Sequence, residues 1–176
     1  MLFRHPAFFA LVAVVLTGAV ISPAAEPTKP ARFLAVSATA GFRHGSIERA
    51  EVVLEELGRS TGLYHLDYLR MPSGNKDDPA WQENLAAQFT KAFDPAVLAD
   101  FDGVMFVSTT GELPVPDLTG FLAWIKSGKA FVGFHAASDT FKSSDAYTEM
   151  IGGHFAGHPW GAGGEHGFVV HEPDHP

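Results

Sequence analysis

The residue with the clearest chemical setting is His135, which follows a short apolar run in the pattern Gly133-x-His135-x-Ala137. Small residues on both sides of one functional residue are typical of the sharp strand-to-helix turn called a nucleophile elbow. An imidazole at that tip can act as a general acid or base, or can bind a metal ion. The alternative is a histidine that only hydrogen-bonds within its own turn.

A second histidine, His44, ends the polar stretch Gly41-Phe42-Arg43-His44, which also follows an apolar run. We expect His44 and His135 to approach each other if the strands that precede them are neighbours near the centre of a sheet. Arg43 would then bind an anion or pair with an acid. The alternative for His44 is a solvated loop residue or a contact at a helix N-terminus. Imidazoles suit several divalent metals, zinc among them, so His44 and His135 are also candidate metal ligands.

The other histidines in the second half of the chain have weaker claims. His154 and His158 are four residues apart, which on a helix suits a metal, but nearby glycines and a proline oppose a helix there. A turn with a hydrogen-bonding His158 is favoured instead. His166 lies in a glycine-rich loop, where a solvated position is the better interpretation. His171 and His175 are predicted to be surface residues.

Carboxylates near these histidines supply further candidates for proton transfer, namely Glu112, Asp139 and Asp145. A Ser–His–Asp triad is not favoured, because no serine occupies a G-x-S-x-G elbow. No G-x-x-x-x-G-K-[ST] sequence is present, so a phosphate-binding P-loop is not predicted.

The elements that must position these residues follow from the spacing of apolar side chains. Short apolar runs predict buried strands at residues 32–37, 64–69, 103–108, 130–134 and 167–171. Amphipathic segments predict helices from residue 47 to Gly58 or Gly62, and at 81–93, 94–99, 117–126 and 145–151. Strands that alternate with helices indicate a parallel α/β sheet covered on both faces. Ligands bind at the carboxyl ends of such strands, where loops 39–44, 108–112 and 135–140 begin.

Composition excludes several classes of protein. The 176 residues contain no cysteine, which excludes a disulfide framework, a Cys-ligated zinc ribbon, an iron–sulfur site and a cysteine nucleophile. The formal net charge is −8, from 12 basic and 20 acidic residues, which argues against a nucleic-acid partner.

The first residues have the pattern of a secretory signal peptide. Arg4 and His5 precede an apolar run at residues 8–21, and small residues around Ala24 suit cleavage after that position. The run is shorter than the roughly 20 apolar residues of a membrane span, so an uncleaved anchor is the less favoured alternative. We therefore expect a signal peptide at 1–24, a linker at 25–31, one domain at 32–176, and a periplasmic or secreted protein with no stable membrane span after cleavage.

Five motifs in order along the chain resemble the trehalose-utilisation (ThuA-like) domain family. They are residues 33–37 with 41–47, residues 101–112, residues 133–140, residues 152–155 with His158 and Pro159, and residues 173–176. The resemblance spans nearly all of 32–176 and is more specific for the family than for any one function.

The resemblance implies a class I glutamine amidotransferase-like, flavodoxin-like three-layer α/β fold with a mostly parallel sheet. True glutaminases of that fold have a cysteine at the elbow, whereas this chain has His135 and no cysteine, so glutaminase chemistry is excluded. Members of the family are linked to the catabolism of disaccharides and their 3-keto derivatives. The family domain usually continues beyond the Pro173-Asp174-His175-Pro176 motif, so we expect the domain to be truncated at its C-terminus.

Together these observations predict a carbohydrate-active enzyme, a hydrolase, lyase or isomerase. The predicted catalytic residues are His135, His44, Asp139 and Glu112, and the predicted substrate-binding residues are Phe42, Arg43, Thr110, Phe134, His158 and Trp160. The aromatic members of this set are expected to stack on a sugar ring. Two alternatives stay open: a non-catalytic module of the same fold that binds sugar or a partner, and a truncated remnant that does not fold stably.

Overall fold

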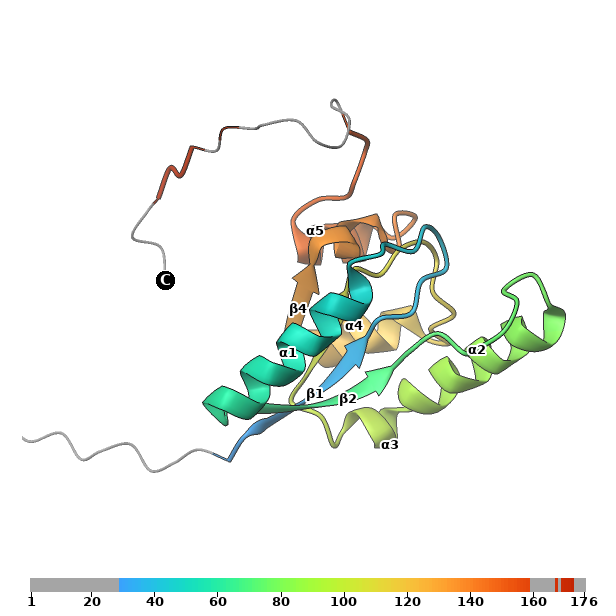
Figure 1. Ribbon diagram of the computed structural model, residues 1–176, viewed down its shortest axis with the longest axis horizontal. Coiled ribbons are helices and arrows are strands. Elements are labelled where there is room, and N and C mark those ends of the chain that lie inside the picture. Colours follow the sequence, from blue (N-terminus) through green and yellow to red (C-terminus); the bar gives the residue numbers. More distant parts are fainter. Residues whose placement is uncertain (1–28, 159–166, 168, 173–176) are drawn as a thin grey trace, which may run out of the picture.

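Four parallel strands form the centre of the computed structural model, which describes residues 29–158, 167 and 169–172 (Figure 1). The strands are β1 (Ala31–Val36), β2 (Tyr64–Leu69), β3 (Gly103–Val107) and β4 (Ala130–Phe134). Their order in the sheet is β2-β1-β3-β4, and every neighbouring pair is parallel. This is the order in which a flavodoxin-like sheet places its first four strands, so the predicted fold class is confirmed.

Helices connect the strands, and their ends follow from capping residues. They are α1 (Ile47–Thr61), α2 (Pro79–Ala92), α3 (Pro95–Leu98), α4 (Leu118–Lys126) and α5 (Asp145–Ile151), with a short 3₁₀ helix η1 (His135–Asp139) directly after β4. Helix α2 begins two residues earlier than predicted, because the Asp78 side chain accepts a hydrogen bond from the amide of Ala80 and Pro79 suits the first helical position. Gly62, in a left-handed conformation, ends α1.

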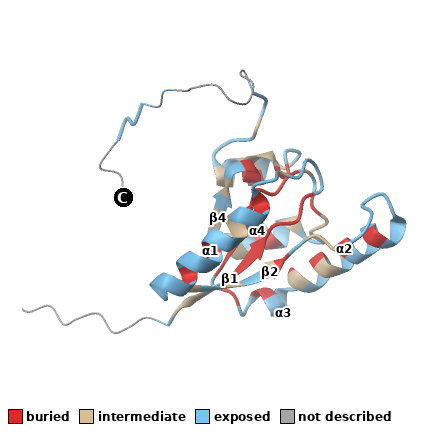
Figure 2. Cartoon of the chain, in the orientation of Figure 1, coloured by how far each residue is buried: buried red, intermediate tan, exposed pale blue. Residues whose placement is uncertain are grey.

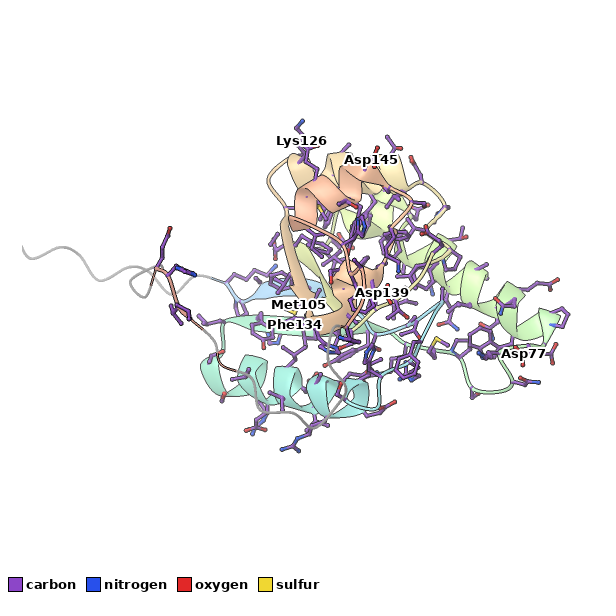
Figure 3. The ribbon with its side chains drawn as sticks, turned by 90° about the horizontal axis from the view of Figure 1, so that it is seen from above. Asp77, Met105, Lys126, Phe134, Asp139 and Asp145 are labelled. Carbon is purple, nitrogen blue, oxygen red and sulfur yellow. The ribbon has the colours of Figure 1, made fainter. Side chains whose placement is uncertain are left out.

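Alternate residues of the strands face two different layers of helices. Leu34 of β1 and Phe106 of β3 belong to a large core with α2, α3, α4 and α5, whereas Ala35 and Met105 pack with Leu54 of α1 on the opposite face. Figure 2 shows the buried residues concentrated along the central strands, and Figure 3 shows α1 on one side of the sheet and the other helices across from it. The arrangement therefore has three layers, as predicted.

The predicted strand at 167–171 is wrong for the part of this segment that the structure describes. Gly167 and residues 169–172 form no strand, and Val169 and Val170 are 77% and 70% exposed. A pair of valines favours extended backbone, but a strand also needs a neighbouring edge and a face to bury, and these residues have neither. His171 is exposed, as expected.

Within the described ranges, no helix combines the length and apolar character that crossing a bilayer requires. The predicted signal peptide at 1–24 and most of the linker lie outside the described residues, so both stay predictions.

Candidate functional site

The loop that follows β1 is fixed onto the end of β3 by three hydrogen bonds. The amides of Ala40 and Gly41 both donate to the carbonyl oxygen of Thr110, at 2.8 and 3.1 Å. In return, the hydroxyl of Thr110 donates to the carbonyl oxygen of Phe42 at 2.7 Å. These bonds hold the segment that carries His44 across the carboxyl end of the central strand.

The loop that follows β3 is in turn bonded to η1 and the residue after it. The amide of Gly111 donates to the carbonyl oxygen of Asp139 at 2.8 Å, and the buried hydroxyls of Thr109 and Thr140 are 2.8 Å apart. Gly111 has a φ of +75°, and a Cβ there would lie 2.7 Å from the amide nitrogen of Gly41. Glycine is therefore required at the point where the loops after β1 and β3 meet.

The turn at His135 has the strained geometry of an elbow. His135 has a φ of +49°, a left-handed conformation that side-chain-bearing residues rarely adopt. A Cβ on Gly133 would lie 3.1 Å from the Cβ of Ala137, so a small residue lets strand and turn approach closely. The hydroxyl of Tyr147 donates to the carbonyl oxygen of Ala137 at 2.9 Å and holds the turn from the α5 side. The predicted elbow is confirmed.

His44 and His135 are in direct contact. Their ring centroids are 4.6 Å apart and their planes meet at 86°, while the ring of Phe42 lies 4.9 Å from that of His44 on another side. The expected approach is confirmed, but the expected reason is wrong, because β3 lies between β1 and β4. The approach results from the bonded loops described above, which carry His44 over the end of β3.

A cavity of about 400 Å³ opens beside the two imidazoles, and we call it the histidine cavity. Its lining residues are Phe42, His44, His135, Ala136, Ser138, Asp139, Phe155 and His158. Apolar walls with a few convergent polar groups are typical of small-molecule sites. Four of the predicted functional side chains besides Phe42 therefore meet in one place: His44, His135, Asp139 and His158.

The surroundings of His44 favour its neutral form. Burial lowers the pKa of His44 most, the neighbouring His135 lowers it further, the carboxylate of Asp139 opposes this, and His158 adds a smaller lowering. Nδ1 of His44 is buried and has no hydrogen-bond partner among the described residues. Nε2 is therefore the ring nitrogen that can meet a ligand in the cavity.

Asp139 is the acidic group of the histidine cavity. One of its oxygens, Oδ1, lies 2.7 Å from Nζ of Lys142, and its side chain is 22% exposed. A half-buried carboxylate next to two imidazoles can stabilise a positive charge that forms on either of them.

Four of the predicted site residues that the structure describes do not line the histidine cavity: Glu112, Thr110, Phe134 and Arg43. The Glu112 carboxylate accepts a hydrogen bond from the Ser143 hydroxyl at 3.0 Å and lines a different cavity. Thr110 is buried and its hydroxyl binds the Phe42 backbone, so it positions a loop. Phe134 packs against the α1 side of the sheet. A strand-end position shows which edge a residue is near, but not the direction of its side chain.

Arg43 pairs with an acid, which is one of the two alternatives drawn from the sequence. Its Nη2 lies 2.7 Å from Oε1 of Glu48, and its Nη1 donates to the carbonyl oxygen of Ser37 at 3.0 Å. Arg43 therefore anchors both ends of the segment that carries His44. Trp160, His166 and His175 lie outside the described residues.

A sequence comparison decides the family. The profile of the ThuA family, described as trehalose utilisation, matches residues 32–176. This chain belongs to the ThuA family. No curated protein matches the chain.

Among solved structures, the ThuA domain is similar to a ThuA-like protein from Parabacteroides merdae ATCC 43184. The two share 19% sequence identity and superpose with a TM-score of 0.51, and the match covers 68% of this chain and 37% of that one. This likeness supports the fold. The chain thus matches little more than a third of the length of that protein.

Metal binding by the ThuA domain stays a prediction. Among the residues that the structure describes, no group of three or more His, Asp or Glu side chains is arranged to hold a metal ion. His44 and His135 offer two imidazoles, whereas zinc sites use three or four protein ligands.

Some residues of the histidine cavity were not predicted from the sequence. Phe155 belongs to the family-like motif at residues 152–155, and its ring lies 4.8 Å from that of His158. Its amide donates to the carbonyl oxygen of Ser138 at 2.9 Å, which brings the segment after α5 back onto η1. The motif shared with the ThuA family was the available signal for Phe155.

Proposed function

We propose that this ThuA domain is an exported enzyme that moves protons on a carbohydrate, a disaccharide or its keto derivative, in the histidine cavity. The observation that carries the proposal is the contact between His44 and His135, at a centroid distance of 4.6 Å, at an elbow on the carboxyl edge of the sheet. Two imidazoles in contact give one group to accept a proton and one to donate it.

His44 is suited to the role of base. Its lowered pKa keeps the ring neutral at neutral pH, and its buried Nδ1 leaves Nε2 to accept a proton from the ligand. The positive charge that then forms on His44 is stabilised by the nearby carboxylate of Asp139.

His135 is suited to the role of acid. Its side chain is exposed at the tip of the elbow and lines the same cavity. In the reaction that we propose, a C–H or O–H bond of the sugar breaks as its proton passes to His44, and a sugar oxygen gains a proton from His135. This exchange satisfies an isomerase, or a lyase in which the C–O bond to the protonated oxygen breaks. In a hydrolase, His44 instead takes the proton of a water molecule that attacks the anomeric carbon, and His135 protonates the glycosidic oxygen as its bond to that carbon breaks.

The walls of the cavity support a carbohydrate ligand. Phe42 is 70% exposed despite its apolar ring, and Phe155 also lines the cavity. Exposed aromatic rings next to a few polar groups suit a ligand with an apolar face and hydroxyls at its edge. The trehalose-utilisation description of the family points to the same class of ligand.

Glutaminase activity is not part of this proposal. The elbow residue is His135, and the sequence contains no cysteine to form a thioester. Export is proposed from the leader-like residues 1–24, and a periplasmic or secreted location follows from it.

The proposal is tested by turnover of trehalose and of its 3-keto derivative by the chain from residue 25 onward. His135→Ala should lower turnover by about a hundredfold or more, because general acid–base groups contribute that much. His65→Ala is the matched control, since His65 lies in β2 near the opposite edge of the sheet. Equal turnover by wild type and His135→Ala would contradict the proposal, and binding without turnover would favour the non-catalytic module.

A further inference from the structure

Helix α4 departs from the pattern of a helix at the surface of a soluble protein. Its only charged residue is Lys126 at its end, and Phe121 is buried in the core. The exposed Ala123 and the half-buried Leu122 and Ile125 occupy positions where a solvated helix face usually carries polar side chains. A helix that is apolar around most of its circumference indicates that a further surface covers it.

A groove of about 560 Å³ lies between α4 and α5, and we call it the α4–α5 groove. Leu122, Ile125 and Met150 form apolar parts of its wall and also pack against the core. The small, exposed side chains of Ala123 and Ala146 line it as well, and they leave room for another chain to approach. Contiguous accessible apolar surface of this kind is typical of a contact site with another molecule.

The two sides of the α4–α5 groove carry opposite charges. Lys126 of α4 and Glu149 of α5 both line the groove, and neither forms a salt bridge within the part of the chain that the structure describes. Figure 3 shows the Lys126 side chain pointing away from the body of the molecule, on the side opposite α1. The other charged residue of α5, Asp145, is also acidic, so α4 presents only positive charge and α5 only negative charge.

We propose that two copies of this chain associate through the α4–α5 groove, about a two-fold axis that runs along the groove. Such an axis places α4 of each copy against α5 of the other. Lys126 then faces Glu149 of the partner subunit, and symmetry repeats this pair. An axis across the groove would instead place α4 against α4 and bring like charges together, which is unfavourable. The surface is therefore complementary to itself, which favours a second copy over a partner of one charge sign.

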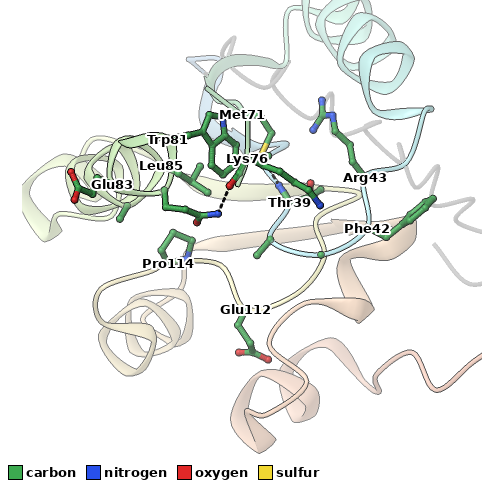
Figure 4. Close-up of a pocket in the computed structure, with 14 residues that line it drawn as sticks. Thr39, Phe42, Arg43, Met71, Lys76, Trp81, Glu83, Leu85, Glu112 and Pro114 are labelled. Atoms are coloured by element: carbon green, nitrogen blue, oxygen red, sulfur yellow. Dashed lines mark hydrogen bonds between the residues drawn. The ribbon is translucent and has the colours of Figure 1, made fainter. Parts of the chain in front are cut away.

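Association through the α4–α5 groove leaves the candidate functional site open. No residue of α4 or α5 lines the histidine cavity, and none lines the larger cavity of about 720 Å³ between the loop after β1 and helix α2 (Figure 4). The dimer is therefore independent of the proposed function, and either can fail without the other.

The test is sedimentation velocity of the chain from residue 25 onward over a wide range of protein concentration. Wild type should dimerise as the concentration rises. Lys126→Glu and Glu149→Lys should each raise the dissociation constant of the dimer about tenfold or more, because each replaces two attractive contacts with two repulsive ones. The variant that combines both substitutions should return to the wild-type value. Lys91→Glu is the matched control and should change nothing, since Lys91 is an exposed lysine in the last turn of α2.

Each other outcome overturns the proposal in a recognisable way. A wild type that stays monomeric at every concentration excludes the dimer. A dimer that neither single substitution weakens forms through another surface, and one that the combined variant does not restore lacks the pairing of Lys126 with Glu149. Thermal melting of each variant, with a Tm close to that of wild type, shows that a loss of association is not a loss of folding.

Discussion

The imidazole rings of His44 and His135 meet edge to face, with centroids 4.6 Å apart, although β3 separates the strands that precede them. The contact depends on backbone hydrogen bonds that tie the loop after β1 to Thr110 and the loop after β3 to Asp139. The position of the proposed base relative to the proposed acid therefore depends on the loops after β1, β3 and β4 and on the hydrogen bonds between them. Substitutions in these loops test this dependence.

The stability of the protein should depend on pH through His44. Its pKa in the folded chain lies below the ordinary value of 6.5, chiefly because of burial, whereas the unfolded chain keeps that value. Above pH 6.5 both states hold a neutral ring, and as the pH falls below it the unfolded chain takes up the proton first. The free energy of unfolding should therefore fall with acidification, and less so in His44→Gln. Urea titrations at several pH values measure this free energy. If it falls with acidification equally in wild type and His44→Gln, folded His44 does not have a lowered pKa.

The elbow should store strain at His135. Its φ of +49° costs glycine nothing, but costs a residue with a Cβ about 1 kcal/mol. His135→Gly should therefore be more stable in urea unfolding than His135→Ala by about 1 kcal/mol, although both lack the imidazole. Equal stability of the two variants would show that the turn is relaxed.

The junction of the loops after β1 and β3 should not accept a side chain at Gly111. A Cβ there meets the amide of Gly41 at 2.7 Å, whereas a Cβ on Gly128, which also has a positive φ, meets nothing within 4 Å. Gly111→Ala should lower the free energy of unfolding by about 2–3 kcal/mol, against about 1 kcal/mol for Gly128→Ala. Thermal or urea unfolding of the two variants measures the difference. Equal losses of stability would show that the backbone at the junction shifts to accommodate the added Cβ.

Two buried threonines should respond to the same substitution with opposite signs. Thr110→Val leaves the carbonyl of Phe42 without its donor and should lower the free energy of unfolding by about 1–2 kcal/mol. Thr39→Val removes a buried hydroxyl that has no partner among the described residues and should raise it by about 1 kcal/mol. A loss of stability in both variants would mean that Thr39 is bonded in the folded protein.

The sheet could be predicted from the sequence because its strands are continuous apolar runs. Residues 103–107, for example, are buried along their whole length, which only a central strand requires. The same reasoning failed at Val169 and Val170, since strand propensity does not supply a neighbouring edge. The order of the strands was also not predictable from their lengths, so the approach of His44 and His135 could be expected only on the condition that β1 and β4 were neighbours, and this condition is not met.

The candidate site was predicted in part for the same reason. His135 was identified by its elbow, because small flanking residues are a local signal. Glu112 and Phe134 were correctly predicted to lie near the carboxyl edge of the sheet. Their side chains point away from the histidine cavity, and no local sequence pattern indicates the direction of a side chain. Thr39 was predicted only as the first residue of the strand-end loop 39–44, since an unpartnered hydroxyl becomes visible only when its surroundings are known.

The most direct test of the central claim is a double-mutant cycle on His44 and His135, with turnover of 3-keto-trehalose as the readout. Residues that act as one unit show losses far from additive, so the double variant should be about as inactive as either single variant. Losses in kcat/KM that simply multiply would show that the two imidazoles act independently and would contradict the account, as would turnover that survives both substitutions.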